Sequence, residues 1–257
     1  MKCLVLAAGY ATRLYPLTEN FPKPLLEVGG KTILDWLVDD IASAGLVDEF
    51  VVISNHKFVR HFEDWARKKE AADNPHGVCK LTVLDDGTDS NENRLGAVKD
   101  IQYAITKLQL KDDLLVIAGD NVLDFSLTSF MEYACEKNTT CIMRYYEADD
   151  RRLSKSGVVE IDENDRVLNM EEKPEKPKSK WCCPPFYYYT KEDAGQVQRG
   201  IDEGCQTDAP GSYIAWLCKQ TVIHAMEMPG KRYDIGNLES YQQVCREYKG
   251  NEQKGGN

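Results

Sequence analysis

Short apolar runs and amphipathic segments alternate along the first half of the chain. Continuous apolar runs at residues 2–6, 50–53, 81–84 and 114–118 are typical of buried strands in a parallel sheet. Between these runs, apolar residues recur at helical spacing in segment 33–44, segment 56–69 is typical of a charged surface helix, and segment 95–108 is predicted to be helical. This alternation predicts an α/β protein with a mainly parallel sheet, right-handed crossovers and flanking helices.

The second half of the chain has shorter elements. We expect strands at 141–146, 158–161, 167–170 and 186–189, and a last helix at 238–247. The polar residues 162–165 predict a hairpin turn between two of these strands. We therefore expect a smaller mixed β lobe on the same sheet, so that residues 1–249 form one domain with halves at about 1–125 and 126–241. Residues 250–257 are expected to be a flexible tail.

Composition excludes several classes of protein. The net charge of −10 and a pI of about 5.0 disfavour general binding to nucleic acids or to anionic membranes. No apolar run approaches the ~18 residues that a membrane helix needs, and the apolar start is too short for a signal peptide. The nine cysteines have irregular spacing with no C-x-x-C pair, which disfavours zinc and thioredoxin-type sites. We expect reduced, mostly buried thiols in a cytoplasmic protein.

A loop of small residues leaves the first apolar run and carries one cation. Small side chains let backbone N–H groups approach an anion, and the Arg13 guanidinium can bridge phosphate oxygens. Pro22 and Pro24 bracket Lys23 and fix the backbone of a second positive charge. The patterns of P-loop kinases and dinucleotide dehydrogenases are both absent. The segment therefore predicts a phosphate-binding loop of another kind, and a plain surface loop is the structural alternative.

The same segment resembles the sugar-phosphate nucleotidylyltransferases, whose pattern is roughly G-x-G-T-R-x-x-P-x-T-x-x-x-P-K-P-L. The matching positions are Gly9, Thr12, Arg13, Pro16, Thr18, Pro22, Lys23, Pro24 and Leu25. The family usually has glycine where this chain has Ala11; we expect a mild change, since alanine still offers its N–H if the loop accepts an ordinary φ. The resemblance extends to about residue 241. It implies a Rossmann-like nucleotide-diphospho-sugar transferase fold with a mixed β lobe for the sugar.

The resemblance also implies roles for residues of the nucleotide half. Arg13 would stabilise the departing pyrophosphate and Lys23 would lie beside the α-phosphate, so both are candidate catalytic residues. Residues 91–97 occupy the place of the base loop of the family. The nucleotide-binding residues that it implies are Leu6, Ala8, Gly9, Tyr10, Ala11, Thr12, Arg13, Leu95, Gly96 and Gly119.

Two aspartates are candidate metal ligands. Asp120 follows a buried run directly, and Asp234 lies in a later D-x-G segment. A carboxylate at a buried strand end is costly unless it is paired or metal-bound, and Mg²⁺ takes hard oxygen ligands together with substrate phosphates. Without the resemblance, the safer interpretation is that Asp120 caps the next segment and that Asp234 is a turn residue. The family carries metal-binding aspartates at both places, so the resemblance implies Mg²⁺ on Asp120 and Asp234.

The sugar side is indicated by residues 170–174, which resemble the E-E-K-P motif of the family. Here the resemblance implies that Glu172 accepts hydrogen bonds from sugar hydroxyls and that Lys173 neutralises the sugar phosphate. A solvated charge run is the alternative. Gly157 begins a G-V-V-E segment whose glycine N–H meets the sugar in the family. The substrate-binding residues expected in this way are Asn121, Gly157, Glu172, Lys173 and Cys183.

Two departures from the family leave the substrates open. Cys183, Pro184 and Pro185 stand where thymidylyltransferases of the family usually have small residues beside the sugar ring. Arg94 stands in the base loop at a position where a small residue is common, so dTTP, UTP, CTP and GTP all remain open. No β-helix repeats follow, so we do not expect the bifunctional acetyltransferase of the same family.

The reaction that the resemblance implies is NTP + sugar 1-phosphate → NDP-sugar + pyrophosphate. The nucleophile is a phosphate oxygen that is ionised at neutral pH, because its second pKa is roughly 6, and no general base is needed. NTP and sugar 1-phosphate are the expected partners, Mg²⁺ is the expected cofactor, and a homo-oligomer is possible.

Two rival functions remain. One is a CTP-dependent cytidylyltransferase that acts on a non-sugar phosphate or phosphonate, such as phosphocholine. The other is a non-catalytic regulatory relative that binds NDP-sugar, which should lack a metal aspartate or the loop arginine. Because Arg13, Lys23, Asp120 and Asp234 are all present, the sequence favours catalysis.

Overall fold

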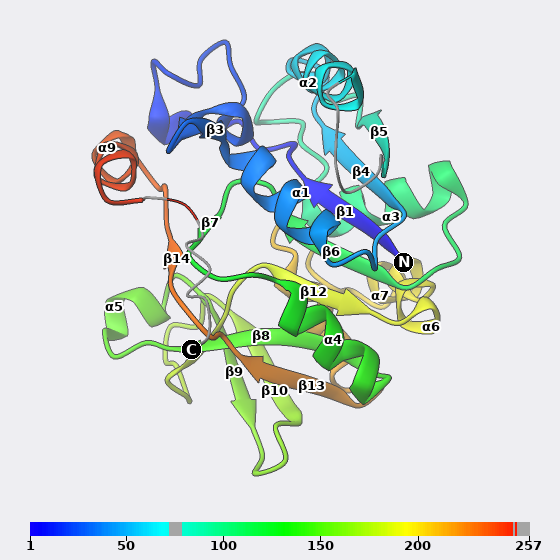
Figure 1. Ribbon diagram of the computed structural model, residues 1–257. Coiled ribbons are helices and arrows are strands. Elements are labelled where there is room, and N and C mark those ends of the chain that lie inside the picture. Colours follow the sequence, from blue (N-terminus) through cyan, green and yellow to red (C-terminus); the bar gives the residue numbers. More distant parts are fainter. Residues whose placement is uncertain (72–78, 249, 251–257) are drawn as a thin grey trace, which may run out of the picture. The chain divides into compact units, whose positions relative to one another are not determined.

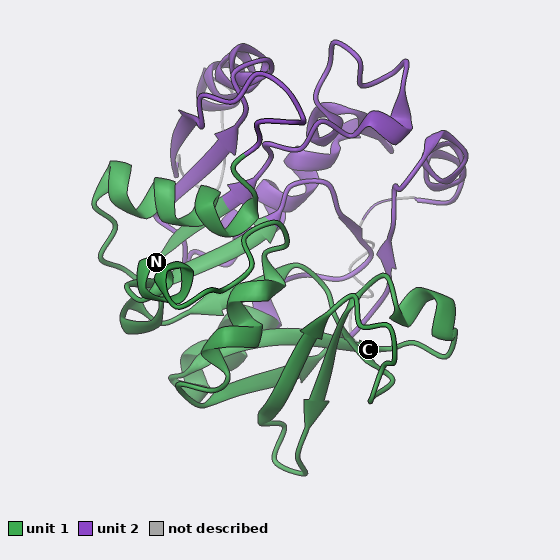
Figure 2. Ribbon diagram, turned by 180° about the vertical axis from the view of Figure 1, so that it is seen from behind, with its two compact units in different colours: residues 1–4, 95–117, 130–228 green, residues 5–94, 118–129, 229–257 purple. Residues whose placement is uncertain are grey.

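The computed structural model describes residues 1–71, 79–248 and 250 (Figure 1). Apart from Gly250, the expected tail at 250–257 lies outside the described residues. The chain divides into two compact units, each assembled from segments far apart in the sequence (Figure 2). Unit 1 consists of Met1–Leu4, Leu95–Ile117 and Phe130–Met228, and unit 2 of Val5–Arg94, Ala118–Ser129 and Pro229–Asn257.

Unit 1 contains an α/β arrangement with a mixed sheet. Its strands run in the order β10 (Val167–Glu172), β9 (Gly157–Ile161), β11 (Trp181–Cys183), β8 (Thr140–Tyr146), β12 (Phe186–Tyr189) and β6 (Leu114–Ala118). The pairings of β12 with β6 and β8, of β11 with β8 and β9, and of β9 with β10 are antiparallel. Strand β13 (Ile223–Glu227) pairs with β8 in parallel. The β9–β10 hairpin confirms the turn expected at 162–165.

The helices of unit 1 are mostly short. They are α3 (Ala97–Leu108), α4 (Thr128–Lys137, whose first two residues belong to unit 2), α5 (Asp150–Leu153), α6 (Lys191–Ala194), α7 (Val197–Asp202) and α8 (Gly211–Leu217). Helix α3 was expected from residue 95 but starts at Ala97, because Gly96 has a φ of +91° that no helix accepts. The fold class expected from the sequence, a sheet flanked by helices with a mixed β lobe, is confirmed.

Unit 2 presents the carboxyl ends of parallel strands at one edge. Strands β4 (Glu49–Ser54) and β5 (Lys80–Asp85) pair in parallel, from Glu49 opposite Lys80 to Ser54 opposite Asp85. Strand β1 (Lys2–Leu6) begins in unit 1 and ends in unit 2, where the Ala7 N–H donates to the Ile53 carbonyl at 2.9 Å. The other elements are η1 (Thr12–Leu14), η2 (Lys23–Leu25), β2 (Glu27–Val28), β3 (Lys31–Thr32), α1 (Ile33–Ser43), α2 (Val59–Ala71), β7 (Val122–Leu123), β14 (Arg232–Tyr233) and α9 (Leu238–Glu247).

Local hydrogen bonds decide where the helices of unit 2 begin. The Thr32 hydroxyl accepts the Asp35 N–H at 3.0 Å and caps α1. Helix α2 was expected from residue 56, yet it starts at Val59. The reason is that the Asn55 side-chain carbonyl accepts the Phe58 N–H at 3.0 Å and holds residues 56–58 in a turn. The expected last helix at 238–247 matches α9.

Two further expectations concern membranes and thiols. None of the helices in the described ranges is long and apolar enough to span a bilayer. All nine cysteines are free thiols; four are buried, and only Cys135 and Cys245 are exposed.

Candidate functional site

The loop after β1 presents a row of unused backbone donors. Within the described part of the chain, no hydrogen bond uses the backbone N–H groups of residues 8–13. The Ala8 carbonyl accepts a hydrogen bond from the Asn55 side-chain amide at 2.9 Å. Gly9 is exposed, and a Cβ there would have nothing within 4 Å. A run of free N–H groups at the carboxyl end of a strand is a cradle for an anion.

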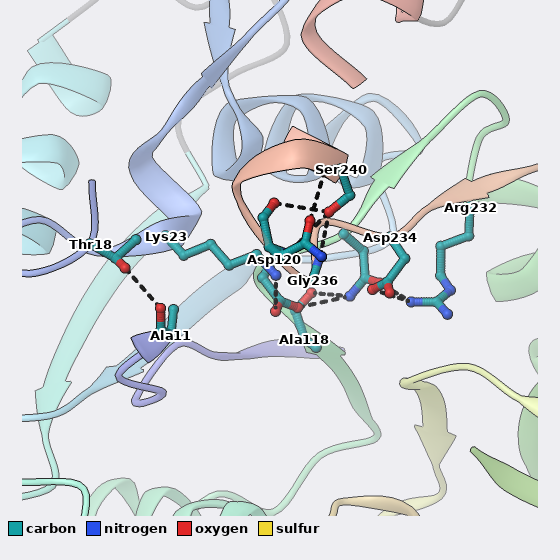
Figure 3. A network of polar contacts seen from close by, with 11 residues as sticks. Ala11, Thr18, Lys23, Ala118, Asp120, Arg232, Asp234, Gly236 and Ser240 are labelled. Atoms are coloured by element: carbon teal, nitrogen blue, oxygen red, sulfur yellow. Dashed lines mark hydrogen bonds and ion pairs between the residues drawn. The ribbon is translucent and has the colours of Figure 1, made fainter. Parts of the chain in front are cut away.

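Ala11 differs from the expectation of an ordinary φ. Its φ is +47° and its ψ is 41°, which is the left-handed region that side chains with a Cβ disfavour. The Ala11 carbonyl accepts both the Leu14 N–H at 2.9 Å and the hydroxyl of buried Thr18 at 2.8 Å (Figure 3). These bonds hold the loop in a conformation that glycine would adopt without strain. The N–H of Ala11 nevertheless remains available.

Two cations stand at the ends of this loop in different situations. Arg13 is exposed and, among the described residues, makes no hydrogen bond or ion pair. Lys23 is only 8% exposed, and its ammonium lies 2.7 Å from Oδ2 of Asp120 (Figure 3). Pro24 at the second position of η2 fixes the backbone that carries Lys23. Arg13 is therefore free to meet a ligand, whereas Lys23 already neutralises a carboxylate.

The two candidate metal aspartates belong to segments that pair directly. Strand β7 follows Asp120, strand β14 precedes Asp234, and the two strands pair antiparallel with Tyr233 opposite Val122. Buried Ile235 packs in the same apolar cluster as Val122 and fixes the backbone beside Asp234. Beyond it, the Ser240 hydroxyl, which belongs to the capping box of α9, also accepts the Gly236 N–H at 3.0 Å. Pairing, burial and capping together place the D-x-G segment beside Asp120.

A polar chain connects the two aspartates. The Asn121 amide nitrogen donates to Asp120 Oδ1 at 3.2 Å and to the Ala118 carbonyl at 3.1 Å. The Arg232 guanidinium donates to the Asn121 oxygen at 3.0 Å and lies 3.7 Å from Asp234 (Figure 3). Burial by itself raises the pKa of Asp120, but the charges of Lys23 and Arg232 outweigh it and the pKa is lowered. Asp120 is thus an ionised carboxylate in this network.

The donor set of these residues fits Mg²⁺ rather than a metal with a closed protein cage. No group of three or more His, Cys, Asp or Glu side chains in the described ranges could hold an ion. Mg²⁺ usually takes one or two carboxylates and completes its octahedron with water and phosphate oxygens. Asp120 and Asp234, whose side chains are 44% and 74% exposed, match that requirement.

In unit 1, three candidate sugar-side residues face one another across three strands. Gly157 of β9 lies opposite Glu172 of β10 on one side and opposite Cys183 of β11 on the other. Burial raises the pKa of the Glu172 carboxyl, partly offset by the nearby Lys173 charge. Cys183 is 8% exposed, and burial raises the pKa of its thiol well above the ordinary value. Lys173 is exposed with a φ of +49°, and its N–H donates to the Ser156 carbonyl at 3.0 Å.

Two glycines make room for the Glu172 carboxylate. A Cβ on Gly157 would lie 3.2 Å from Glu172 Oε1, and one on Gly211 would lie 2.0 Å from the same atom. Glycine at 211 is therefore required for this side chain to occupy its present position, and a Cβ at 157 would displace it slightly. Gly211 was not singled out in the sequence, although the Pro210-Gly211 pair is a recognisable breaker before α8.

Leu95 and Gly96 also lie in unit 1, next to the segment that leads to Gly211. A Cβ on Gly96 would meet the Thr207 carbonyl oxygen at 2.5 Å, and the Val98 N–H donates to the same carbonyl at 3.0 Å. In unit 2, a Cβ on Gly119 would meet the Val5 side chain at 2.8 Å, and the Gly119 N–H donates to the Leu6 carbonyl at 3.0 Å. Gly96 therefore permits close backbone approach at the start of α3, and Gly119 permits close packing at the end of β6.

The structure thus gathers the predicted residues into two groups, one in each unit. Unit 2 contains the loop after β1 together with Lys23, Gly119, Asp120, Asn121 and Asp234. Unit 1 contains Leu95, Gly96, Gly157, Glu172, Lys173 and Cys183. Sequence reasoning missed Arg232. The available signal was its position two residues before Asp234, since alternate residues of a strand point to one side.

Comparison with known proteins agrees with this arrangement. The model of the nucleotidyl transferase family matches residues 2–251. The uridylyltransferase AglF of Haloferax volcanii is named as acting on UTP and glucose 1-phosphate. It is 27% identical to this chain, and the alignment covers 92% of this chain and 91% of AglF. The bifunctional protein GlmU of Methanococcus aeolicus is 30% identical over 92% of this chain. A solved UDP-glucose pyrophosphorylase in complex with UDP-glucose superposes with a TM-score of 0.78 at 22% identity, covering 95% of this chain and 97% of that one.

The chain therefore belongs to the nucleotidyl transferase family. Within that family it is similar to sugar-1-phosphate nucleotidyltransferases, as the sequence resemblance predicted. It spans about half the length of the GlmU relatives, 51% in each of two archaeal proteins.

Proposed function

We propose that this protein is a sugar-1-phosphate nucleotidylyltransferase that forms an NDP-sugar and pyrophosphate. The observation that carries the proposal is the row of N–H groups at residues 8–13, which ends at the guanidinium of Arg13; none of these groups has a partner among the described residues. Such a cradle binds phosphates, and it lies in the same unit as the Lys23–Asp120 pair. The family match and the named activities of AglF and other relatives support the same reaction.

The reaction requires little covalent chemistry from the protein. An oxygen of the sugar phosphate attacks the α-phosphorus of the NTP, the new P–O bond forms, and the bond to the β-phosphate oxygen breaks in line. Pyrophosphate leaves as the negative charge moves onto it. Arg13 and the loop N–H groups stabilise that charge, and Lys23 neutralises the α-phosphate. Catalysis therefore depends on positioning and on electrostatic stabilisation.

Asp120 and Asp234 are the residues that would hold Mg²⁺, which when bound neutralises phosphate charge at the reacting centre. On the acceptor side, Glu172 accepts hydrogen bonds from sugar hydroxyls and the exposed Lys173 neutralises the sugar phosphate. Gly157 lies opposite Glu172 and leaves room for its carboxylate. Glucose 1-phosphate should be tested first, with UTP and with dTTP, because relatives are named as UTP–glucose-1-phosphate uridylyltransferases and as a glucose-1-phosphate thymidylyltransferase.

The test is pyrophosphate release with Mg²⁺ across ATP, CTP, GTP, UTP and dTTP, each combined with several hexose 1-phosphates and with phosphocholine. Asp120→Asn should abolish the release, while Asp112→Asn, an exposed aspartate in the turn before β6, should leave it unchanged. Release with a hexose 1-phosphate supports the proposal. Release only with CTP and phosphocholine, or no release with any pair, overturns it.

A further inference from the structure

Both candidate metal carboxylates already face cations of the chain itself. Lys23 lies 2.7 Å from Asp120, and Arg232 lies 3.7 Å from Asp234. Lys23 is buried and the Arg232 side chain is only 20% exposed, so neither cation is a loosely held surface charge. The carboxylates that would hold a divalent cation are therefore neutralised by residues that are themselves attracted to phosphate.

Arg232 is held in place by more than its pairing with Asp234. Its backbone belongs to the β14–β7 ladder, opposite Leu123, and its guanidinium donates to Asn121 at 3.0 Å. Asn121 is 3% exposed, and its nitrogen and oxygen point to Asp120 and Arg232 respectively. This amide can satisfy both neighbours in one orientation only, since its oxygen accepts and its nitrogen donates. The orientation of Arg232 is thus coupled to that of Asp120 through one buried side chain.

We propose that Arg232, together with Lys23, closes the Asp120–Asp234 pair to a free divalent cation until a nucleotide binds. This inference rests on the proposed function. The phosphates of the nucleotide attract the two cations away from the carboxylates, which then become ligands for the metal. Metal and nucleotide binding are consequently coupled, and each raises the affinity of the protein for the other.

A purely structural role for Arg232 makes the opposite prediction. If the guanidinium only holds Asp234 and Asn121 in place, its removal disorders the carboxylates and weakens metal binding. If it is a competing charge, its removal strengthens metal binding to the nucleotide-free protein, because one repulsive cation is gone. The sign of the change in affinity separates the two roles without any need for turnover.

The experiment titrates Mn²⁺ into the nucleotide-free, full-length protein and measures free Mn²⁺ by electron paramagnetic resonance. Arg232→Gln should bind Mn²⁺ about tenfold more tightly than wild type, and Arg232→Lys, which keeps the charge, should stay close to wild type. Lys231→Gln is the matched control, since Lys231 lies one residue earlier, is exposed, and contacts the ring of Tyr233 instead. Adding Asp120→Asn to Arg232→Gln should abolish the gain.

Unchanged or weaker Mn²⁺ binding by Arg232→Gln overturns the inference, and so does an equal gain in Lys231→Gln. If Arg232→Gln does not fold, as judged by circular dichroism, Lys23→Gln provides the second test, because it removes the other cation and should also tighten Mn²⁺ binding. Pyrophosphate release measured on the same wild-type preparation reports on the proposed function separately. If the wild-type protein is inactive but Arg232→Gln still binds Mn²⁺ more tightly, the proposed function is wrong, while the inference that Arg232 competes with the metal is supported.

Discussion

The ammonium of Lys23 lies 2.7 Å from Oδ2 of Asp120, although 97 positions separate the two residues in the sequence. Lys23 is 8% exposed, whereas the Asp120 side chain is 44% exposed. The pair is thus buried at its cationic end and open at its anionic end. This asymmetry suits a residue that must reach a ligand from within the protein and a carboxylate that must remain accessible to one.

Lys23→Gln should lower the free energy of unfolding by about 1 kcal/mol near neutral pH, a figure kept small because Asp120 is partly solvated. Because the folded pKa of Asp120 is lowered, its ionisation stabilises the fold above the unfolded pKa of about 3.9, and this stability is lost as pH falls through the folded pKa. The difference in the free energy of unfolding between wild type and variant, measured by urea titration, should therefore decrease below about pH 4. Lys31→Gln, which breaks an exposed pair with Asp39, should have a smaller effect at every pH.

Arg13→Ala should reduce kcat/KM by an amount on the order of 3 kcal/mol, the size of one preorganised donor to a transition state. Its stability should stay within about 0.5 kcal/mol of wild type, because Arg13 is exposed and has no partner among the described residues. Steady-state kinetics and thermal unfolding measure the two quantities. Arg60→Ala, an exposed arginine of α2, should change neither. A rate of Arg13→Ala within a few-fold of wild type would show that the cradle does not use this guanidinium.

Ala11→Gly should stabilise the protein by about 0.5–1 kcal/mol, since glycine occupies φ of +47° without the penalty that a Cβ incurs. The same change at Ala44, where φ is −72°, should instead destabilise the protein, because it only adds backbone freedom to the unfolded chain. Urea midpoints of the two variants provide the comparison. A loss of stability in Ala11→Gly as large as that in Ala44→Gly would contradict the strained loop.

Glu172→Gln should alter the dependence of stability on pH. Burial raises the folded pKa of Glu172, so the protonated form is favoured in the fold. The resulting stability is fully present below the unfolded pKa of about 4.3 and is lost as pH rises through the raised folded value. Because glutamine stays neutral, the stability of the variant relative to wild type should increase as pH rises above about 4. Thermal midpoints measured from pH 4 to pH 7 test this, and parallel curves for the two proteins would refute it.

Gly211→Ala and Gly96→Ala should separate function from folding. The new Cβ at 211 would meet the flexible ends of the Glu172 and Met170 side chains, which can shift, so the fold should survive while the KM for the sugar phosphate rises. The new Cβ at 96 would meet the Thr207 backbone at 2.5 Å, and the φ of +91° adds strain, so this variant should lose several kcal/mol of stability or fail to fold. Equal losses of stability in both variants would show that Glu172 cannot move.

The sequence alone was sufficient for the elements with strong periodicity and for the residues of contiguous motifs. The strand at 2–6, the helix at 238–247 and the hairpin at 162–165 follow from local patterns of apolar and turn residues. The loop that carries Arg13 and the segment that carries Glu172 are recognisable because their residues are neighbours in the chain. In each case the information lies within a few positions.

Features that depend on contacts between segments far apart in the sequence were decided only by the tertiary structure. The left-handed φ of Ala11 depends on a bond from Thr18, and the late start of α2 depends on Asn55. Arg232 gains its significance only when β14 pairs with β7 and brings its guanidinium to Asn121. Gly211 matters because the Glu172 side chain lies against it. No local pattern specifies such contacts, because they are set by strand register and packing between distant segments.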